Sequence, residues 1–238
     1  MNEVAGFARI RPISWRWTAL LVLAFSLGAW AISTFAVPYF LGGKALTNFG
    51  HDRRVGLFIH ICAAGIALLV GPTQFWMGWT GHFVRLHRKL GTLYVISVVV
   101  SCLTAVYLVA TTRRGLVFGS GLGALTVAWI LATTLAYVAI MRRQFQQHWE
   151  WMIRSYILTF VFVNFRLMVM LMRALKVGTS EDRLEIAIWL SWIGPLLIAE
   201  AIMQGRKIFR ATVAKRHPFH AGHAVVKDED SARDQVAI

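Results

Sequence analysis

Four long stretches of this chain contain no Asp, Glu, Lys or Arg. They are 27, 30, 23 and 27 residues long and cover Trp17–Gly43, Val55–Val84, Leu90–Thr112 and Gly115–Met141. A helix that rises about 1.5 Å per residue needs about 20 residues to cross a hydrocarbon layer about 30 Å thick. Each stretch is therefore long enough to span a membrane. Because 57% of all residues are hydrophobic and only 15% are charged, a soluble globular enzyme is excluded.

Two further segments are long enough to span a membrane but contain ionisable side chains. Trp151–Met172 contains Arg154 and Arg166, and Ile186–Gly205 contains Glu200. Neither segment has the period-of-two pattern of a membrane β-barrel, and a chain inside the bilayer must satisfy its backbone hydrogen bonds internally. The sequence therefore predicts an all-α fold, a polytopic integral membrane helical bundle with six transmembrane helices.

Lys and Arg are unevenly distributed over the ends of these six helices. The amino terminus, the second and fourth loops and the start of the tail hold 13 of them, and the alternate loops hold 8. Because Lys and Arg accumulate on the cytoplasmic side, both termini are expected in the cytoplasm. The net charge of +14 is then mostly a basic collar that faces anionic lipid headgroups, so the lipid bilayer is an expected partner and nucleic acid is not.

Polar side chains inside a span are costly unless they face the bundle interior and find a partner there. Counting residues from the helix ends places these side chains at two depths. The outer layer consists of His60, Tyr107, Asn164 and Arg166. The inner layer consists of Gln74, His87, Tyr94, His148, Trp151, Arg154 and Glu200. Near Gln74, the pair Gly71-Pro72 is expected to kink the second helix and free backbone carbonyls.

Two inner-layer histidines come from different helices. His87 and His148 are the minimum needed for axial ligation of a b-type haem iron, and Arg88 and Arg154 would suit the haem propionates. The same layer could instead bind a quinone headgroup or a lipid phosphate. Histidines beside basic residues at helix ends also serve as interfacial anchors. Composition and spacing do not choose between these alternatives.

Two residues of the outer layer have alternatives of their own. His60 is either a buried histidine that bonds a neighbouring carbonyl or a ligand-binding residue. Arg166 cannot lose its charge, and it lies too deep in its span to reach the membrane surface without strain. We therefore expect Arg166 to bond helix-end carbonyls or a bound anion.

Three strings, taken in their order and spacing, resemble a known family. They are Gly71-Pro72-Thr73-Gln74-Phe75, His87-Arg88-Lys89-Leu90-Gly91-Thr92-Leu93-Tyr94 and His148-Trp149-Glu150-Trp151-Met152-Ile153-Arg154-Ser155, with His60 upstream and Asn164-Phe165-Arg166-Leu167 downstream. The combination resembles the predicted bacterial membrane proteins grouped as domain of unknown function 2306. The resemblance covers about residues 55–172 and implies a bacterial inner-membrane location but no particular reaction. The marker positions that it implies include His60, Gln74, His87, Arg88, Tyr94, His148, Arg154 and Arg166.

The expected organisation has four parts. Residues 1–54 form the cytoplasmic amino terminus, the first helix and an outer loop, residues 55–175 a four-helix family core, residues 176–214 the sixth helix with its basic inner end, and residues 215–238 a flexible polar tail. The leading hypothesis is an inner-membrane protein that binds haem b or quinone through its inner histidines and supports membrane electron transfer. The alternative is a non-enzymatic transporter, complex-assembly or structural membrane protein. Whether the chain is an enzyme, and whether its partner is a quinone or a membrane complex, stays open.

Overall fold

The computed structural model of the protein describes residues 15–41 and 51–216, so almost all of the predicted polar tail at 215–238 lies outside the described residues. Every regular element in these ranges is a helix. The elements are α1 (Trp15–Ala31), the π-helix η2 (Ile32–Ala36), α2 (Val37–Phe40), α4 (His51–Thr80), α5 (Val84–Ala110), α6 (Leu116–Met141), α7 (Phe145–Thr159), α8 (Val161–Ala174) and α9 (Ser180–Arg216). The chain falls into two units, Met1–Leu196 and Leu197–Ile238.

Five of the described helices are long and apolar enough to cross a membrane, and the bent pair α7 and α8 makes up to six spans. The predicted all-helical membrane bundle is therefore confirmed. Its outward faces are apolar, as a surface in contact with lipid requires. Leu103, Ile96 and Leu131, for example, expose 69%, 55% and 54% of their surface.

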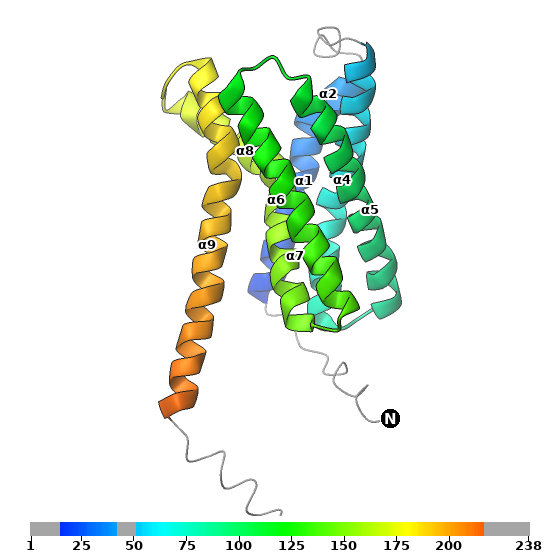
Figure 1. Cartoon of the computed structure of the whole chain (residues 1–238), viewed down its shortest axis with the longest axis vertical. Coiled ribbons are helices and arrows are strands. Elements are labelled where there is room, and N and C mark those ends of the chain that lie inside the picture. The colour runs from blue at the N-terminus through cyan, green and yellow to red at the C-terminus, as the bar shows by residue number, and fades with distance from the viewer. Residues whose placement is uncertain (1–14, 42–50, 217–238) are drawn as a thin grey trace, which may run out of the picture. The chain divides into compact units, whose positions relative to one another are not determined.

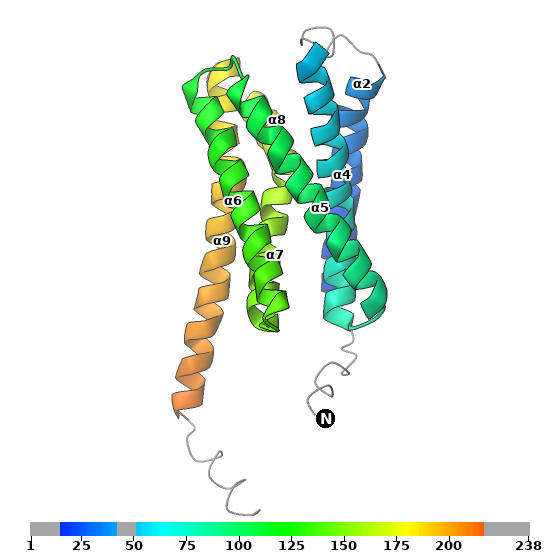
Figure 2. The same ribbon diagram turned by 45° about the vertical axis from the view of Figure 1, so that its right-hand side comes forward.

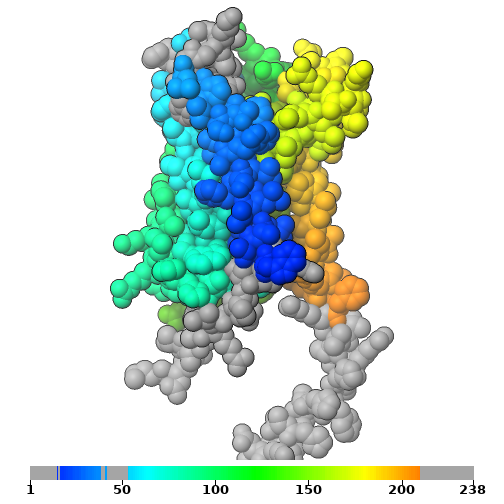
Figure 3. Space-filling view, turned by 180° about the vertical axis from the view of Figure 1, so that it is seen from behind, coloured from blue at the N-terminus to red at the C-terminus, as the bar shows by residue number. Residues whose placement is uncertain are grey.

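The first unit is built from neighbouring helices that pack in sequence. Helix α4 packs against α5, α5 against α6, and α6 against α7, as Figure 1 and Figure 2 show. Helix α1 closes the other side of α4 and also touches α8. Figure 3 shows α1 in blue on the surface, with α4 in cyan on one side of it and α8 in yellow on the other.

The first span is not one regular helix, because Pro38 interrupts it. Proline has no backbone N–H, so it cannot take part in the regular ladder of hydrogen bonds. The chain passes through the π-helix Ile32–Ala36 before α2 begins, with Pro38 in the first turn of α2. The π-helix brings Phe35 against Trp30, with the two ring centroids 5.5 Å apart.

Helices α5 and α7 begin earlier than the uncharged runs indicated. The third span was expected from Leu90 and the fifth from Trp151, whereas the helices start at Val84 and Phe145. Charged residues end an apolar run but do not break a helix, so the helices continue past the apolar stretch. His87 and His148 consequently lie inside the first turns of α5 and α7, not in the loops before them.

The fifth span is broken in the middle. Helix α7 ends at Thr159 and α8 starts at Val161, and the two axes differ by 46°. The hydrogen bonds tighten here, since the N–H of Val163 donates to the Phe160 carbonyl three residues before it. The break gives the two halves of this span different neighbours, with α7 packed on α6 and α8 reaching α1.

Helix α4 continues through the predicted kink site at Gly71-Pro72. Pro72 cannot donate to the carbonyl of Leu68, four residues earlier. The hydroxyl of Tyr156 on α7 donates to that carbonyl instead, at 3.1 Å. Gly71 makes room for the Tyr156 ring, because a Cβ at position 71 would lie only 2.0 Å from its Cε2 atom. Tyr156 of α7 therefore packs against α4 at the pair Gly71-Pro72.

Candidate functional site: the inner end of the bundle

The loops α4–α5 (residues 81–83) and α6–α7 (residues 142–144) lie at the same end of the bundle, which we call the inner end (Figure 1). His87 is the fourth residue of α5, and His148 is the fourth residue of α7. Both histidines therefore lie in the first turns of their helices at this end.

One ring nitrogen of His148 makes a hydrogen bond within the protein, and the other makes none to the described residues. Its Nδ1 lies 2.8 Å from the backbone carbonyl of Ala136 on α6. Because a carbonyl can only accept, Nδ1 carries the proton and donates it. In the neutral imidazole, the other nitrogen, Nε2, is unprotonated and can accept a hydrogen bond or bind a metal. Metal-binding histidines commonly have this arrangement, with a fixed Nδ1–H and an open Nε2.

His87 is held less completely. Its ring packs over Gly78 of α4, with Cε1 3.4 Å from where a Cβ would stand. The backbone of Gln74 lies beside the ring. Even so, no hydrogen bond of ordinary geometry from the described residues reaches the buried Nδ1 atom. His87 therefore has a buried polar atom with unused hydrogen-bonding capacity.

Gln74 is the second residue at the inner end with such an atom. Its side chain is only 5% exposed, and its Oε1 faces Gly91 of α5, 3.4 Å from where a Cβ would stand. The amide nitrogen Nε2 is buried and has no hydrogen-bond partner among the described residues. Nearly all buried polar atoms in proteins are paired, so an unpaired amide donor at the same end of the bundle as the His87 Nδ1 atom indicates a missing partner such as a ligand or a water.

Aromatic rings line α4 and α7 next to Gln74. The ring of Phe75 meets Trp149 edge-on at 5.4 Å, and Trp79 meets Trp149 at 5.6 Å. Phe75 also contacts Tyr156 at 5.5 Å. The inner end therefore combines a few buried polar atoms with packed aromatic side chains.

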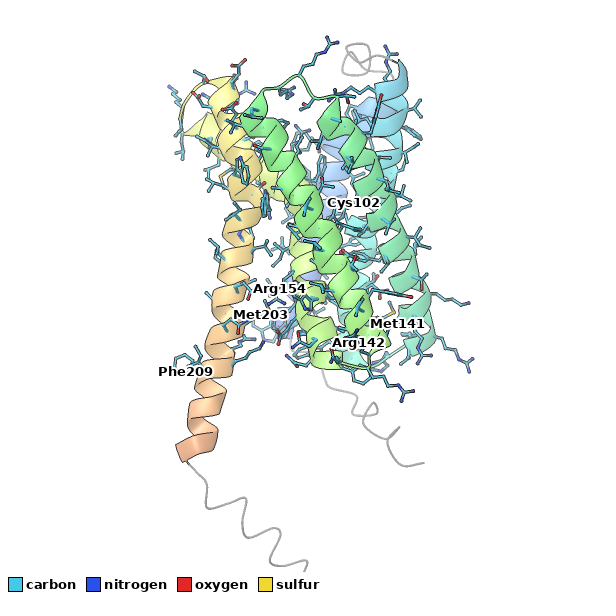
Figure 4. The ribbon with its side chains drawn as sticks, viewed as in Figure 1. Cys102, Met141, Arg142, Arg154, Met203 and Phe209 are labelled. Atoms are coloured by element: carbon cyan, nitrogen blue, oxygen red, sulfur yellow. The ribbon has the colours of Figure 1, made fainter. Side chains whose placement is uncertain are left out.

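The two arginines expected near the haem propionates have different surroundings. Arg154 lies over the ring of Trp151, with its guanidinium carbon 4.5 Å from the ring centroid. Figure 4 shows Arg154 on α7, with Arg142 at the adjoining end of α6. The side chain of Arg88 is exposed. Arg154 is therefore partly fixed by the protein, and Arg88 is open to the surroundings.

Tyr94 lies in the core, where the protein satisfies its hydroxyl. The ring is fully buried, and its Oη lies 2.9 Å from Ser155 Oγ and 2.7 Å from Thr159 Oγ1 on α7. Thr133 on α6 adds a contact of 2.7 Å to Ser155, and the Trp129 indole donates to Thr159 at 3.0 Å. We call Thr133, Ser155, Tyr94 and Thr159 the hydroxyl chain. Its members already have protein partners, so it ties α5, α6 and α7 together.

The hydroxyl chain also shows what the sequence did not reveal. Trp129, Thr133 and Thr159 were not among the predicted site residues. Their one sequence signal is the four-residue spacing of Trp129 and Thr133, which puts both on one face of α6. The hydroxyl at each end of the chain donates a hydrogen bond to a backbone carbonyl: Thr159 to that of Ser155 and Thr133 to that of Trp129, both at 2.9 Å.

The four residues of the predicted outer layer each contact different partners and do not form one cluster. His60 Nδ1 lies 2.9 Å from the Ser101 carbonyl on α5, so His60 donates to a neighbouring carbonyl as one alternative held. Asn164 donates to the Ser191 carbonyl at 3.2 Å. Tyr107 is 40% exposed and packs beside Gly56. Arg166 lies among phenylalanine rings on α8, with Phe35 nearest at 4.9 Å.

Metal binding by protein side chains alone has no support in the described part of the chain, which has no group of three or more His, Cys, Asp or Glu residues suited to a metal ion. The cysteines do not pair, since Cys62 and Cys102 are both free. A haem needs only two axial side chains, and for that group His148 has a suitable open Nε2 atom. His87 meets the requirement less clearly, because its ring rests on the α4 backbone.

These features define a multi-pass helical membrane protein with a small polar site at one end of its bundle. A family model described as "Predicted membrane protein (DUF2306)" matches residues 57–203, which is more than half of the chain. The chain belongs to this family, as the resemblance predicted, and the match extends beyond the expected four-helix core into α9. No curated protein matches the chain, and no solved structure does.

Proposed function

We propose that the protein binds a redox cofactor at the inner end and takes part in membrane electron transfer. The observation that carries the proposal is the pair of buried atoms without a hydrogen bond of ordinary geometry, Gln74 Nε2 and His87 Nδ1, at the same end of the bundle as His148. A quinone headgroup suits this pair best. Its carbonyl oxygens accept hydrogen bonds from an amide and an imidazole, and its flat apolar ring packs on aromatic side chains.

Haem b is a second candidate, and the arrangement of His148 favours it. The bond from Nδ1 to the Ala136 carbonyl fixes the ring and leaves Nε2 free, as in an axial iron ligand. His87 would be the other ligand, and Arg154 and Arg88 would face the propionates. Haem would supply one-electron transfer, and the protein would supply the two imidazoles and the basic residues around it.

The proposed location is a bacterial inner membrane with both termini in the cytoplasm. The excess of Lys and Arg at the amino terminus, the second and fourth loops and the start of the tail supports this orientation. The inner end would then face the cytoplasmic leaflet, so a quinone would enter from the lipid phase of that leaflet.

The test compares four purified proteins: the original chain, Gln74→Leu, His87→Ala and the control Gln144→Leu. Gln144 is an exposed glutamine at the same end of the bundle, just before α7. Solvent extraction followed by chromatography measures the quinone bound per protein. We expect the original chain and the control to retain quinone. Loss of one buried hydrogen bond should weaken binding about tenfold in the other two variants.

An optical spectrum of the same samples, and of a fifth protein, His148→Ala, separates the two cofactors. A Soret band that disappears in His87→Ala and His148→Ala would identify haem instead of quinone. If none of the preparations contains quinone or haem after expression in cells rich in both, the electron-transfer proposal is wrong. A transport, complex-assembly or structural role would then take its place.

A further inference from the structure

Arg166 is a second polar feature, distant from the inner end. It follows His148 by 18 residues, which corresponds to about 27 Å of helix. It also precedes the last residue of α8, Ala174, by eight residues, or about 12 Å. The residue thus lies in the half of the bundle opposite the cofactor site, and within a span. No part of the function proposed above uses it.

The guanidinium of Arg166 lies among phenylalanine rings. Its central carbon is 4.9 Å from the centroid of Phe35, 5.5 Å from that of Phe162 and 5.8 Å from that of Phe165. We call these three residues the phenylalanine cage. Phe35 belongs to the π-helix η2, and insertions of this kind often occur at functional sites. The cage stabilises the charge through the ring faces, but it offers no acceptor to the guanidinium N–H groups.

These N–H groups have no acceptor elsewhere in the part of the chain that the structure describes. The side chain is half-buried, its Nε atom is buried without a hydrogen-bond partner, and no described carboxylate pairs with it. A guanidinium keeps its charge at any physiological pH and has five donors in one plane. Unlike a histidine, it cannot become neutral, so the missing partner must bring acceptor atoms and negative charge.

We propose that Arg166 and the phenylalanine cage bind an oxyanion. The planar fork of a guanidinium matches two oxygens of a phosphate or carboxylate, and such paired bonds are the strongest that arginine makes. The partial burial of the side chain lowers the local dielectric constant, which strengthens each bond. The phosphate group of an anionic lipid and a free phosphate ion share the required chemistry. The depth of about 12 Å is within reach of a lipid whose headgroup is drawn in between helices.

The experiment uses the full chain in detergent, with two probes. Native mass spectrometry counts phosphatidylglycerol molecules retained by the protein, with phosphatidylcholine as the neutral reference. Titration calorimetry measures the binding of inorganic phosphate in the absence of lipid. The variants are Arg166→Gln, Arg166→Lys and the control Arg173→Gln. Arg173 is an exposed arginine in the last turn of the same helix, so its removal lowers the net charge equally.

We expect saturable binding of phosphatidylglycerol, of phosphate or of both to the original chain and to Arg173→Gln. Binding to Arg166→Gln should be at least tenfold weaker. Arg166→Lys keeps the charge but loses the planar fork, so its affinity should lie between the two. This variant also tests the site if Arg166→Gln fails to fold. Binding of the lipid without phosphate identifies a lipid site, and binding of both identifies a general oxyanion site.

Two results would overturn the inference. One is the absence of saturable binding of either probe to the original chain. The other is equal loss of binding in Arg166→Gln and Arg173→Gln, because the effect would then reflect net charge alone. Neither result bears on the cofactor site, since the quinone and haem measurements use residues at the inner end.

Discussion

The close approach of Tyr156 to Gly71 gives the most sharply testable consequence of the fold. In Gly71→Ala, the new Cβ would lie 2.0 Å from Cε2, 2.3 Å from Cδ2 and 3.0 Å from Cζ of the Tyr156 ring. Ordinary carbon contacts are about 3.5–4.0 Å, so the ring would have to move by roughly 1.5 Å. That movement would pull its hydroxyl away from the Leu68 carbonyl and press the ring into Phe75 and Phe160.

The expected loss of stability can be worked out from these contacts. Overpacking of this kind costs about 1–3 kcal/mol, and a lost hydrogen bond costs about 1 kcal/mol more. Replacing a glycine inside a helix by alanine stabilises the folded state by about 0.5–1 kcal/mol, which offsets part of this loss. The net loss of about 1–3 kcal/mol should lower the apparent melting temperature by roughly 2–12 °C, measured by circular dichroism in detergent.

A matched control lies in the same helix. In Gly65→Ala the new Cβ would be 3.6 Å from Ile32 Cδ1, an ordinary contact, so its melting temperature should stay the same or rise slightly. If Gly71→Ala is as stable as Gly65→Ala, the close contact described between Tyr156 and Gly71 is wrong.

A double-mutant cycle tests the role of Pro72 in the contact between Tyr156 and helix α4. Tyr156→Phe should cost about 1 kcal/mol, because the Leu68 carbonyl loses its hydrogen-bond donor. In a Pro72→Ala background the new alanine N–H can donate to Leu68, so Tyr156→Phe should cost almost nothing there. Equal costs in the two backgrounds would refute the reasoning.

Two further predictions concern the hydroxyl chain and the orientation. Tyr94→Phe should lower stability by about 1–3 kcal/mol, since Ser155 and Thr159 on α7 each lose one buried hydrogen-bond partner, whereas the exposed Tyr137→Phe should have no effect; thermal unfolding in detergent measures both. For the orientation, Cys62 and Cys102 are first replaced by alanine, and single cysteines are placed at Arg113 and Arg142. A membrane-impermeant maleimide added to intact spheroplasts should label position 113 at once and position 142 only after lysis, and the reverse pattern would invert the proposed topology.

The spans were predictable because a membrane restricts composition as well as periodicity. Runs without charge located α4, α5 and α6, and their lengths alone indicated helices that cross a bilayer. The starts of α5 and α7 were not predictable in this way. Arg88 and Lys89 end an apolar run, yet both are good helix formers, so the helix continues through them. The break at Phe160 had no sequence signal, because neither glycine nor proline is present there.

The sequence predicted the depth of the candidate site residues in the membrane, but not the side-chain contacts that they make. Residue counting put His87 and His148 at one level, and both lie in the first turns of their helices at the inner end. The count could not show that His148 Nδ1 donates a hydrogen bond to the Ala136 carbonyl. Nor could it show that the Tyr94 hydroxyl makes a hydrogen bond with Ser155 and not with a ligand. Such contacts depend on how each helix is rotated about its axis, and a span that is apolar on all sides leaves that rotation undetermined.

The hydroxyl chain has a consequence for how the protein is made. Helices enter the membrane in the order in which the ribosome supplies them, so α5 and α6 are present before α7. Until α7 arrives, the Tyr94 hydroxyl on α5 and the Trp129 indole on α6 have no partner, because Ser155 and Thr159 supply their bonds. A nascent chain that ends at Met141 would hold two exposed donors in lipid. Insertion of α7 is therefore the step at which both donors gain their hydrogen-bond partners.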